Sequence, residues 1–152
     1  MPDHIWQQVS DAIVTAITDA AITVDVGGSP APLLVFDEPP DNETVDATET
    51  PAAFVNILRE SVEISSVGYY RREAICMITL VARPTANAAR QLFTMQSGIE
   101  VAIEEDAALA ALLNDMTMVS SGLMTQRGEA VRGARSIEYR LMRALPRTNP
   151  AP

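Results

Sequence analysis

The sequence predicts an α+β fold. We expect a single domain in which a mainly antiparallel, mixed β-sheet of about four to five strands packs with an N-terminal helix and a long central helix. Three observations lead to this prediction. Residues 5–20 carry apolar side chains at helical spacing, residues 72–83 are apolar on both faces of a strand, and residues 136–145 alternate between apolar and polar side chains. The 152 residues fit one domain, and 47% hydrophobic residues is ordinary for a soluble globular protein.

The first helix is expected to run from Ile5 to about Ala20, with Asp3 as its N-terminal cap. Its inward stripe has the spacing of an amphipathic helix, with Trp6 at the edge, and consists of Ile5, Val9, Ala12, Ile13, Ala16, Ile17 and Ala20. A short extended piece and a turn marked by glycine and proline follow at 22–32, and residues 33–36 are predicted as a brief strand.

Residues 37–51 are predicted to form a long, exposed and mobile loop. The segment contains two adjacent prolines, and Val45 is its only large apolar residue, so it has little surface to bury. The EF-hand pattern is absent and no histidine is close, which argues against a cation site. Long loops in compact domains are often functional. Its six acids are therefore candidate interface residues: Asp37, Glu38, Asp41, Glu43, Asp46 and Glu49.

The middle of the chain is predicted to be extended. Residues 54–58 form a short strand, residues 59–67 alternate with Val62 and Ile64 on one side, and Gly68 marks a turn. The strand at 72–83 has two apolar faces, so we expect a central strand that is covered on both sides. One face carries Ala74, Cys76, Ile78, Leu80 and Ala82, and the other carries Ile75, Met77, Thr79 and Val81. Cys76 is interpreted as a small core residue.

The second long helix is predicted to open at Thr85. Its inward stripe is predicted to be Ala89, Leu92, Phe93, Gln96, Ile99 and Ile103, with Gly98 weakening the middle slightly. Asp106 caps a short helix at 107–113. A strand at 116–124, a basic glycine-rich connection at 126–134 and a final strand at 136–145 complete the domain, followed by a flexible tail at 146–152. In the final strand the inward residues are Ile137, Tyr139 and Leu141.

Charge is distributed unevenly along the chain. The net charge is −9, and all 11 basic residues are arginine. Residues 1–58 contain ten acids and no arginine, whereas residues 127–147 contain six arginines and two acids. These charges are either solvated surface or complementary ends that contact other copies or other proteins. The candidate basic interface residues are Arg71, Arg72, Arg127, Arg132 and Arg135. The negative net charge argues against gripping nucleic acid phosphates as a main task.

Residues for catalysis or cofactor binding are scarce. The chain has one histidine, one cysteine and no lysine, and it lacks metal-ligand spacings, a dinucleotide fingerprint and a Walker motif. We therefore predict no enzyme activity, no metal and no cofactor. The longest apolar runs are too short to span a bilayer, and the N-terminus lacks the basic start of a signal peptide. We expect a soluble protein in a reducing cytoplasm with no membrane partner.

The order of these elements resembles a known family. An amphipathic helix and an acidic loop precede "PAAFVNIL" and the arm "RESVEISS". The strand "RREAICMITLVAR" leads into "TANAARQLFTMQSGIEVAIEED" and its companion "AALAALL", and the chain closes on "MTMVSSGLMTQRGEAVRGARSIEYRLMRAL". Over about residues 5–145 this pattern is similar to the tail terminator family of long-tailed bacteriophages, which includes equivalents in gene transfer agents. The most telling features are the strand led by Pro51, the Arg71–Arg72 entry and Asp106 before the short helix.

The resemblance implies a structural virion protein. Members of that family form a homohexameric ring that caps the tail tube, ends its polymerisation and offers its other face to the neck. The implied partners are other copies of the chain, the tail tube protein and a neck or head-completion protein, while DNA passes through the lumen without specific binding. The implied location is the tail–neck junction of the virion, with assembly in the host bacterial cytoplasm.

Two other classes stay open on the sequence alone. Another ring-forming neck, connector or tail-completion protein would obey the same physics and differ in the partner that each face meets. A small α+β enzyme or ligand-binding domain would need a concave site with convergent polar groups, and the sequence does not locate one.

Overall fold

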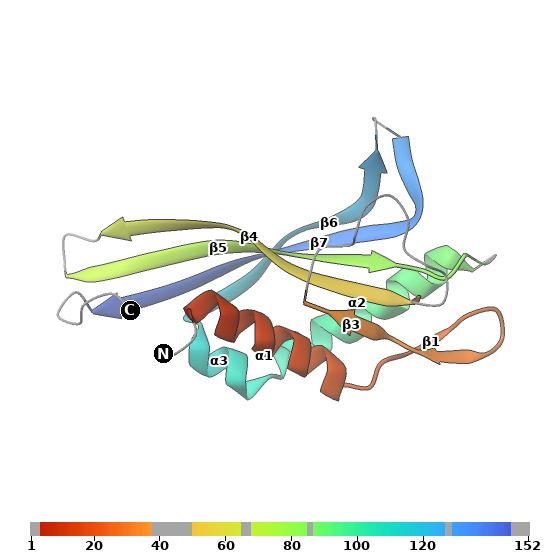
Figure 1. Ribbon diagram of the computed structural model, residues 1–152, viewed down its shortest axis with the longest axis horizontal. Helices are drawn as coiled ribbons and strands as arrows, with labels where there is room; N and C mark the ends of the chain where they lie inside the picture. Colours follow the sequence, from red (N-terminus) through yellow and green to blue (C-terminus); the bar gives the residue numbers. More distant parts are fainter. Residues whose placement is uncertain (1–3, 38–49, 65–67, 85–86, 127–128, 147–152) are drawn as a thin grey trace.

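The protein is built as one large β-sheet with helices on one side (Figure 1). The computed structural model describes residues 4–37, 50–64, 68–84, 87–126 and 129–146. Three helices lie along the same face of the sheet (Figure 1): α1 (Ile5–Asp19), α2 (Ala88–Glu104) and α3 (Ala107–Leu112). A separate two-stranded sheet pairs β1 (Thr23–Asp25) with β2 (Pro30–Pro32).

The large sheet has five strands in the order β3-β4-β5-β7-β6. Their bounds are β3 (Leu34–Phe36), β4 (Ala52–Ile64), β5 (Tyr69–Val81), β6 (Asp115–Gln126) and β7 (Glu129–Pro146). The short β3 runs parallel to β4, and the other neighbours are antiparallel. The α+β class and the mainly antiparallel, mixed sheet with an N-terminal and a long central helix are therefore confirmed.

β5 is the central strand, as its two apolar faces predicted. Ile78 pairs with Val55 on β4 and with Ile137 on β7, and all three side chains are fully buried on the helix side of the sheet. The expectation that β5 is covered on both faces was only partly right. On the face away from the helices Ile75, Met77 and Val81 remain partly exposed within the single chain, because α1, α2 and α3 all pack on the opposite face.

α1 forms over nearly the predicted range and buries most of the predicted stripe. Ile13 and Ile17 on its inner face are among the most deeply buried side chains, and Trp6 is buried as well. The cap differs from the prediction. Nδ1 of His4 accepts a hydrogen bond from the backbone N–H of Trp6 at 3.2 Å, whereas Asp3 lies outside the described residues. Ala20 follows the end of the helix and is exposed.

The buried face of α2 corrects the sequence-based stripe. The buried residues are Gln91, Leu92, Met95, Ile99 and Ile103, whereas Ala89 is exposed and Phe93 is 59% exposed. The prediction placed both Leu92 and Phe93 inward. Adjacent residues on a helix point roughly 100° apart, so the two side chains cannot both face the sheet, and the predicted stripe is rotated relative to the buried face. Gln91 is accepted in the core because its amide bonds the backbone N–H and carbonyl of Arg83. α2 begins at Ala88; residue 85 lies outside the described residues.

Gly98 permits a close approach between α2 and the chain before β1. A Cβ atom built at this position would lie 3.0 Å from both Cγ1 and Cδ1 of Ile22. Real Cβ atoms rarely make so short a contact, so Ile22 occupies the space that a side chain at residue 98 would need.

Replacing this glycine tests the contact. We expect Gly98→Ala to lower the free energy of unfolding by about 1 kcal/mol. Overpacking against Ile22 should cost ~1–3 kcal/mol, which outweighs the gain of about 1 kcal/mol from the higher helix propensity of alanine. In an Ile22→Ala background, where the space is free, the same substitution should raise stability. Urea unfolding of the four proteins measures both effects. Equal stabilisation in the two backgrounds would contradict the close approach.

Several strand boundaries differ from the predictions. β4 is one strand of 13 residues with an irregularity between Ile57 and Arg59, where two separate pieces were expected. β6 and β7 extend through most of the predicted connection at 126–134, of which only residues 127–128 lie outside the description. The predicted cap of α3 is confirmed, since Oδ2 of Asp106 accepts from the N–H of Leu109 at 2.9 Å.

Candidate protein interface

The sheet has two long edges without a strand partner among the described residues. β3 pairs only with Ala52, Ala53 and Phe54, so the rest of β4 has β5 on one side and no described strand on the other. β6, at the far end of the strand order, pairs only with β7. Unpaired edges present backbone N–H and carbonyl groups to any extended chain that approaches, so natural sheets usually protect them.

Exposed apolar side chains concentrate on these two edge strands. On β4, Val62 is 52% exposed and Ile64 is 58% exposed, and Leu58 is exposed as well. On β6 the exposed apolar residues are Val119 and Leu123. Five of the eight large apolar residues that are exposed in the described chain therefore lie at the two edges, which marks the edges as contact surfaces.

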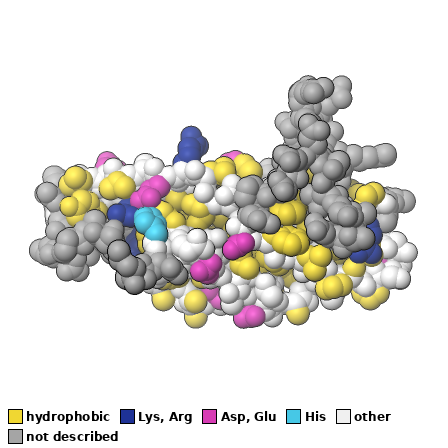
Figure 2. Space-filling model, viewed as in Figure 1, with side chains coloured by type: hydrophobic (Ala, Val, Ile, Leu, Met, Phe, Trp, Pro, Cys, Tyr) yellow, Lys and Arg dark blue, Asp and Glu magenta, His cyan; other side chains and the backbone are white. Residues whose placement is uncertain are grey.

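One edge belongs to an arm that projects beyond the helices. We call the arm residues 58–64 of β4, 69–73 of β5 and 142–146 of β7, which extend past α1 and α3 (Figure 1). Figure 2 shows hydrophobic side chains on the surface at this end of the molecule. Val62 pairs with Arg72 and Ile64 with Tyr70, so these four residues share the helix side of the sheet. Because the helices do not reach the arm, its apolar side is not covered by them.

Arg72 is anchored at the base of the arm. It is 9% exposed, forms an ion pair with Glu60 at 3.2 Å and lies 3.4 Å from Nε2 of His4. Its Nε is buried without a hydrogen-bond partner in the described structure. The adjacent Arg71 points to the opposite face, where it pairs with Glu73. The predicted pair of arginines is thus split between the two faces of the strand, with Arg72 fixing the arm to α1.

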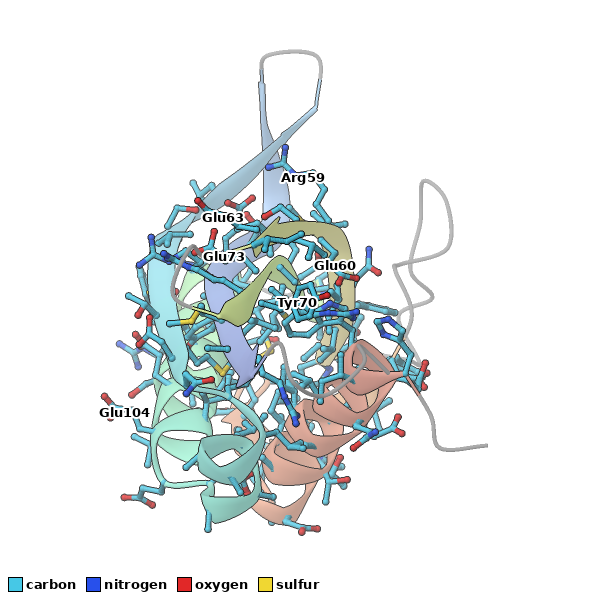
Figure 3. All side chains as sticks on the ribbon, turned by 90° about the vertical axis from the view of Figure 1, so that its left-hand side faces the viewer. Arg59, Glu60, Glu63, Tyr70, Glu73 and Glu104 are labelled. Atoms are coloured by element: carbon cyan, nitrogen blue, oxygen red, sulfur yellow. The ribbon has the colours of Figure 1, made fainter. Side chains whose placement is uncertain are left out.

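A hollow of about 400 Å³ lies against the free edge of β4. Its lining includes His4, Trp6, Asp37, Asn56, Arg59 and Glu60. Arg59 is exposed and makes no hydrogen bond or ion pair with a described residue. Figure 3 views the arm from its end: Arg59, Glu63 and Glu73 lie on the side away from the helices, and Glu60 lies at the β4 edge. Asp37 is the one residue of the predicted acidic interface that the description includes, and it lies at this edge.

The remaining candidate residues fall into two groups. Glu38, Asp41, Glu43, Asp46, Glu49 and Arg127 lie outside the described residues. Arg132 lies in β7, but its side chain is outside the description. Arg135 is half-buried against its own chain: Nε donates to Oε1 of Gln96 at 2.6 Å, and the guanidinium lies 5.1 Å from the Phe93 ring centroid. Arg135 therefore links α2 with β7 within the chain, and its role at a partner surface stays a prediction.

A second hollow, of about 430 Å³, lies at the opposite edge of the sheet, beside β6 and on the helix side. It is bounded by the end of α2, by α3, by the start of β6 and by Tyr139 of β7. Burial raises the pKa of Tyr139 to about 12, and the negative charges of Glu100 and Glu104 contribute to the increase. Sequence reasoning missed this hollow, since Tyr139 was expected to point into the core.

The described residues offer little for catalysis. Cys76 is fully buried, and burial raises its pKa to about 12, so the reactive thiolate is scarce at neutral pH. His4 is engaged in capping α1. No group of three or more His, Cys, Asp or Glu side chains in the described ranges is arranged to hold a metal ion. None of the described helices is long and apolar enough to cross a membrane.

Comparison with known proteins adds no assignment. No family model matches the chain, and no curated protein matches it either. The resemblance to tail terminators in the order of elements therefore stays a prediction, and the two edges carry the functional argument.

Proposed function

We propose that the chain is a structural subunit that assembles into a homohexameric ring and caps a phage-type tail tube. The ring would end tube polymerisation and present its other face to the neck or head-completion protein, at the tail–neck junction of the virion. The observation that carries this proposal is the pair of apolar edges at opposite ends of one sheet, which over most of their length have no strand partner among the described residues. The family resemblance supplies the closure at six subunits and the identity of the partners.

The strand directions favour head-to-tail contacts. β4, β5, β7 and β6 are antiparallel at each step, so β4 and β6 run in opposite directions. A second copy placed beside the first therefore brings its β4 edge antiparallel to β6 and continues the hydrogen-bonding pattern of the sheet. A contact between two different surfaces repeats from copy to copy and closes into a ring when the rotation allows it.

The charge of the chain agrees with a passive passage for DNA. With 20 acidic and 11 basic residues, the assembled ring would be strongly negative. Phosphate-binding proteins use clustered Lys and Arg, and a net negative lumen repels the DNA backbone. We therefore expect the DNA to pass without specific binding, and no enzyme activity is part of this proposal.

Cysteine cross-linking tests the head-to-tail contact. Ser61 on β4 and Ser120 on β6 are exposed, and their register places both side chains on the face away from the helices. Treated with a flexible bismaleimide, a mixture of Ser61→Cys and Ser120→Cys proteins should give a cross-linked dimer, whereas each alone should not. A chain carrying both substitutions should give a ladder that ends at the hexamer on a denaturing gel.

Two controls make the result specific. Cys76 is buried and inert, so the introduced thiols are the reactive ones. Ser97→Cys on the exposed face of α2, mixed with Ser61→Cys, should give no dimer. Adding Val62→Asp and Ile64→Asp should remove the ladder and leave the circular dichroism spectrum unchanged. A ladder that ends at another number, or no cross-link between the edges at high protein concentration, would refute the proposed assembly.

A further inference from the structure

The hollow of about 400 Å³ at the β4 edge contains buried hydrogen-bond donors that lack acceptors. Trp6 lines this hollow and is 7% exposed, and its indole Nε1 is buried without a partner among the described residues. The Nε of Arg72, which contacts the lining residues His4 and Glu60, is also buried and unpartnered. Buried N–H groups nearly always have an acceptor, and leaving one without costs free energy. Two such donors beside one hollow indicate that an acceptor from outside the chain binds there.

The histidine between these two residues adds a third donor. Nδ1 of His4 accepts from the backbone N–H of Trp6, so the neutral ring carries its proton on Nε2. This Nε2 lies 3.4 Å from Nη1 of Arg72, and a guanidinium has only donors. The described carboxylate that pairs with Arg72 is that of Glu60, at 3.2 Å. The cluster therefore has more N–H groups than acceptors, which favours a ligand with acceptor oxygens.

The hollow also lies at the positive end of a helix. His4, Trp6 and Gln7 are at the start of α1 and line the hollow, and the first turn of α1 contains no acidic side chain. Negative charge is favourable at a helix N-terminus because of the helix dipole and the free backbone N–H groups there. Arg59 of β4 borders the hollow and is exposed. Both features favour an anion over a neutral acceptor.

We propose that the hollow at the β4 edge binds a carboxylate group. Asp37 and Glu60 also line the hollow, so they repel a singly charged carboxylate less than a doubly charged phosphate. Carboxylate oxygens accept hydrogen bonds from several donors at once, as the cluster around Trp6 requires. The apolar side chains of the lining suit a short alkyl stem, and they are Val55, Ile57 and Leu58. The site does not depend on the proposed ring.

Two side chains that occur once in the chain report on this site. Trp6 is the only tryptophan and His4 the only histidine, and both line the hollow. In ¹⁵N-labelled protein, butyrate should move the single indole N–H signal downfield and saturably, because a hydrogen bond to a carboxylate deshields the proton. Butyramide has the same stem without the charge, and it should bind more weakly by roughly tenfold or more.

Removing the indole donor tests its role. Trp6→Phe keeps an aromatic ring at this position, and butyrate binding is then followed at the Cε1–H of His4. The affinity should fall by roughly tenfold or more, the usual loss when a hydrogen bond to a charged group is removed. Arg59→Gln should weaken binding by a smaller factor, whereas Arg140→Gln, at an exposed arginine of β7, should leave it unchanged. Equal affinities for butyrate and butyramide, or unchanged affinity in Trp6→Phe, would overturn the proposal.

Protein concentration separates the two sources of a carboxylate. A shift that requires added butyrate at every protein concentration would assign the site to a free short-chain acid. The same shift on raising the protein concentration without acid, if Arg59→Gln removes it, would assign the site to an Asp or Glu side chain of a second copy. That second result would rest on the head-to-tail contact, which the cross-linking experiment tests separately. An indole signal that stays in place under both conditions would contradict the carboxylate site.

Discussion

Replacing Ile78 by aspartate is expected to abolish cooperative folding. Ile78 is fully buried in the central strand, between Val55 and Ile137 on the neighbouring strands. A carboxylate there would lie among the buried apolar side chains of the core and would lose its hydration, which costs several kcal/mol. That loss is comparable with the ~5–15 kcal/mol by which an ordinary domain is stable. Far-ultraviolet circular dichroism during heating should show no cooperative transition.

The matched control for this variant is Val101→Asp. Val101 lies on the exposed face of α2, so the same carboxylate stays in water and should change stability by less than about 1 kcal/mol. Ile78→Val removes one methylene group and should cost about 0.5–1.5 kcal/mol. An Ile78→Asp protein that is monomeric and melts near the wild-type temperature would show that the core lies elsewhere.

Truncating Met95 should be the most damaging change on α2. Met95 is fully buried against the sheet, so Met95→Ala removes buried surface and leaves a cavity. Such substitutions lower the free energy of unfolding by about 2–5 kcal/mol. Phe93→Ala should cost about 1 kcal/mol or less, because Phe93 is largely exposed and its main contact is the Arg135 guanidinium.

Denaturant titration of the two variants compares the structure directly with the stripe predicted from the sequence. The sequence placed Phe93 inward and did not include Met95. If Phe93→Ala proved the more destabilising of the two, the rotation of α2 in the structure would be wrong and the sequence-based stripe would be right. The m-value reports the surface that is exposed on unfolding. Similar m-values in the two variants would show that they differ in stability and not in the extent of unfolding.

The parts of the fold that follow from periodicity were predictable. Ile13 lies in a 3.6-residue pattern, Ile137 in a two-residue pattern and Ile78 in a run that is apolar on both faces, and each residue is fully buried as expected. Phe93 was misplaced because several neighbouring apolar residues fit an inward stripe equally well. Only contact with the sheet selects Met95, and tertiary contacts are not visible in a local pattern.

The lengths of the strands were underestimated for a different reason. Residues 59–64 continue β4 as exposed strand, and residues 129–134 continue β7 where a connection was predicted. The extension of β7 is held by backbone pairing with distant residues, such as Ala134 with Val81 and Ala130 with Thr125, and such pairing leaves no signal in a local sequence pattern. The glycine-rich composition around Gly133 was therefore interpreted as a connection, although Gly133 lies within β7 and has a φ of 78°.

The sequence predicted the strand that forms the candidate interface but not its exposure beyond the helices. The alternation of Val62 and Ile64 predicted a two-sided strand, but the sequence does not show that the helices end before this segment. Arg135, a predicted interface residue, bonds Gln96 within the chain, and its role at a partner surface stays a prediction. Arg59, which lines the hollow at the β4 edge, was not selected from the sequence. The hollow at Tyr139 joins residues of α2, α3, β6 and β7 and needs the tertiary structure to be found.

The position of β7 has a consequence for how the chain folds. β7 is the last of the described strands in sequence, yet it lies between β5 and β6 in the interior of the sheet. Val81 pairs with Ala134 and Tyr69 with Pro146, so two helices and a strand separate the partners in sequence. Contacts of this kind require long loops to close first and slow folding. During synthesis β5 keeps one edge open until β7 has left the ribosome, and a stop codon within β7 would remove an interior strand of the sheet.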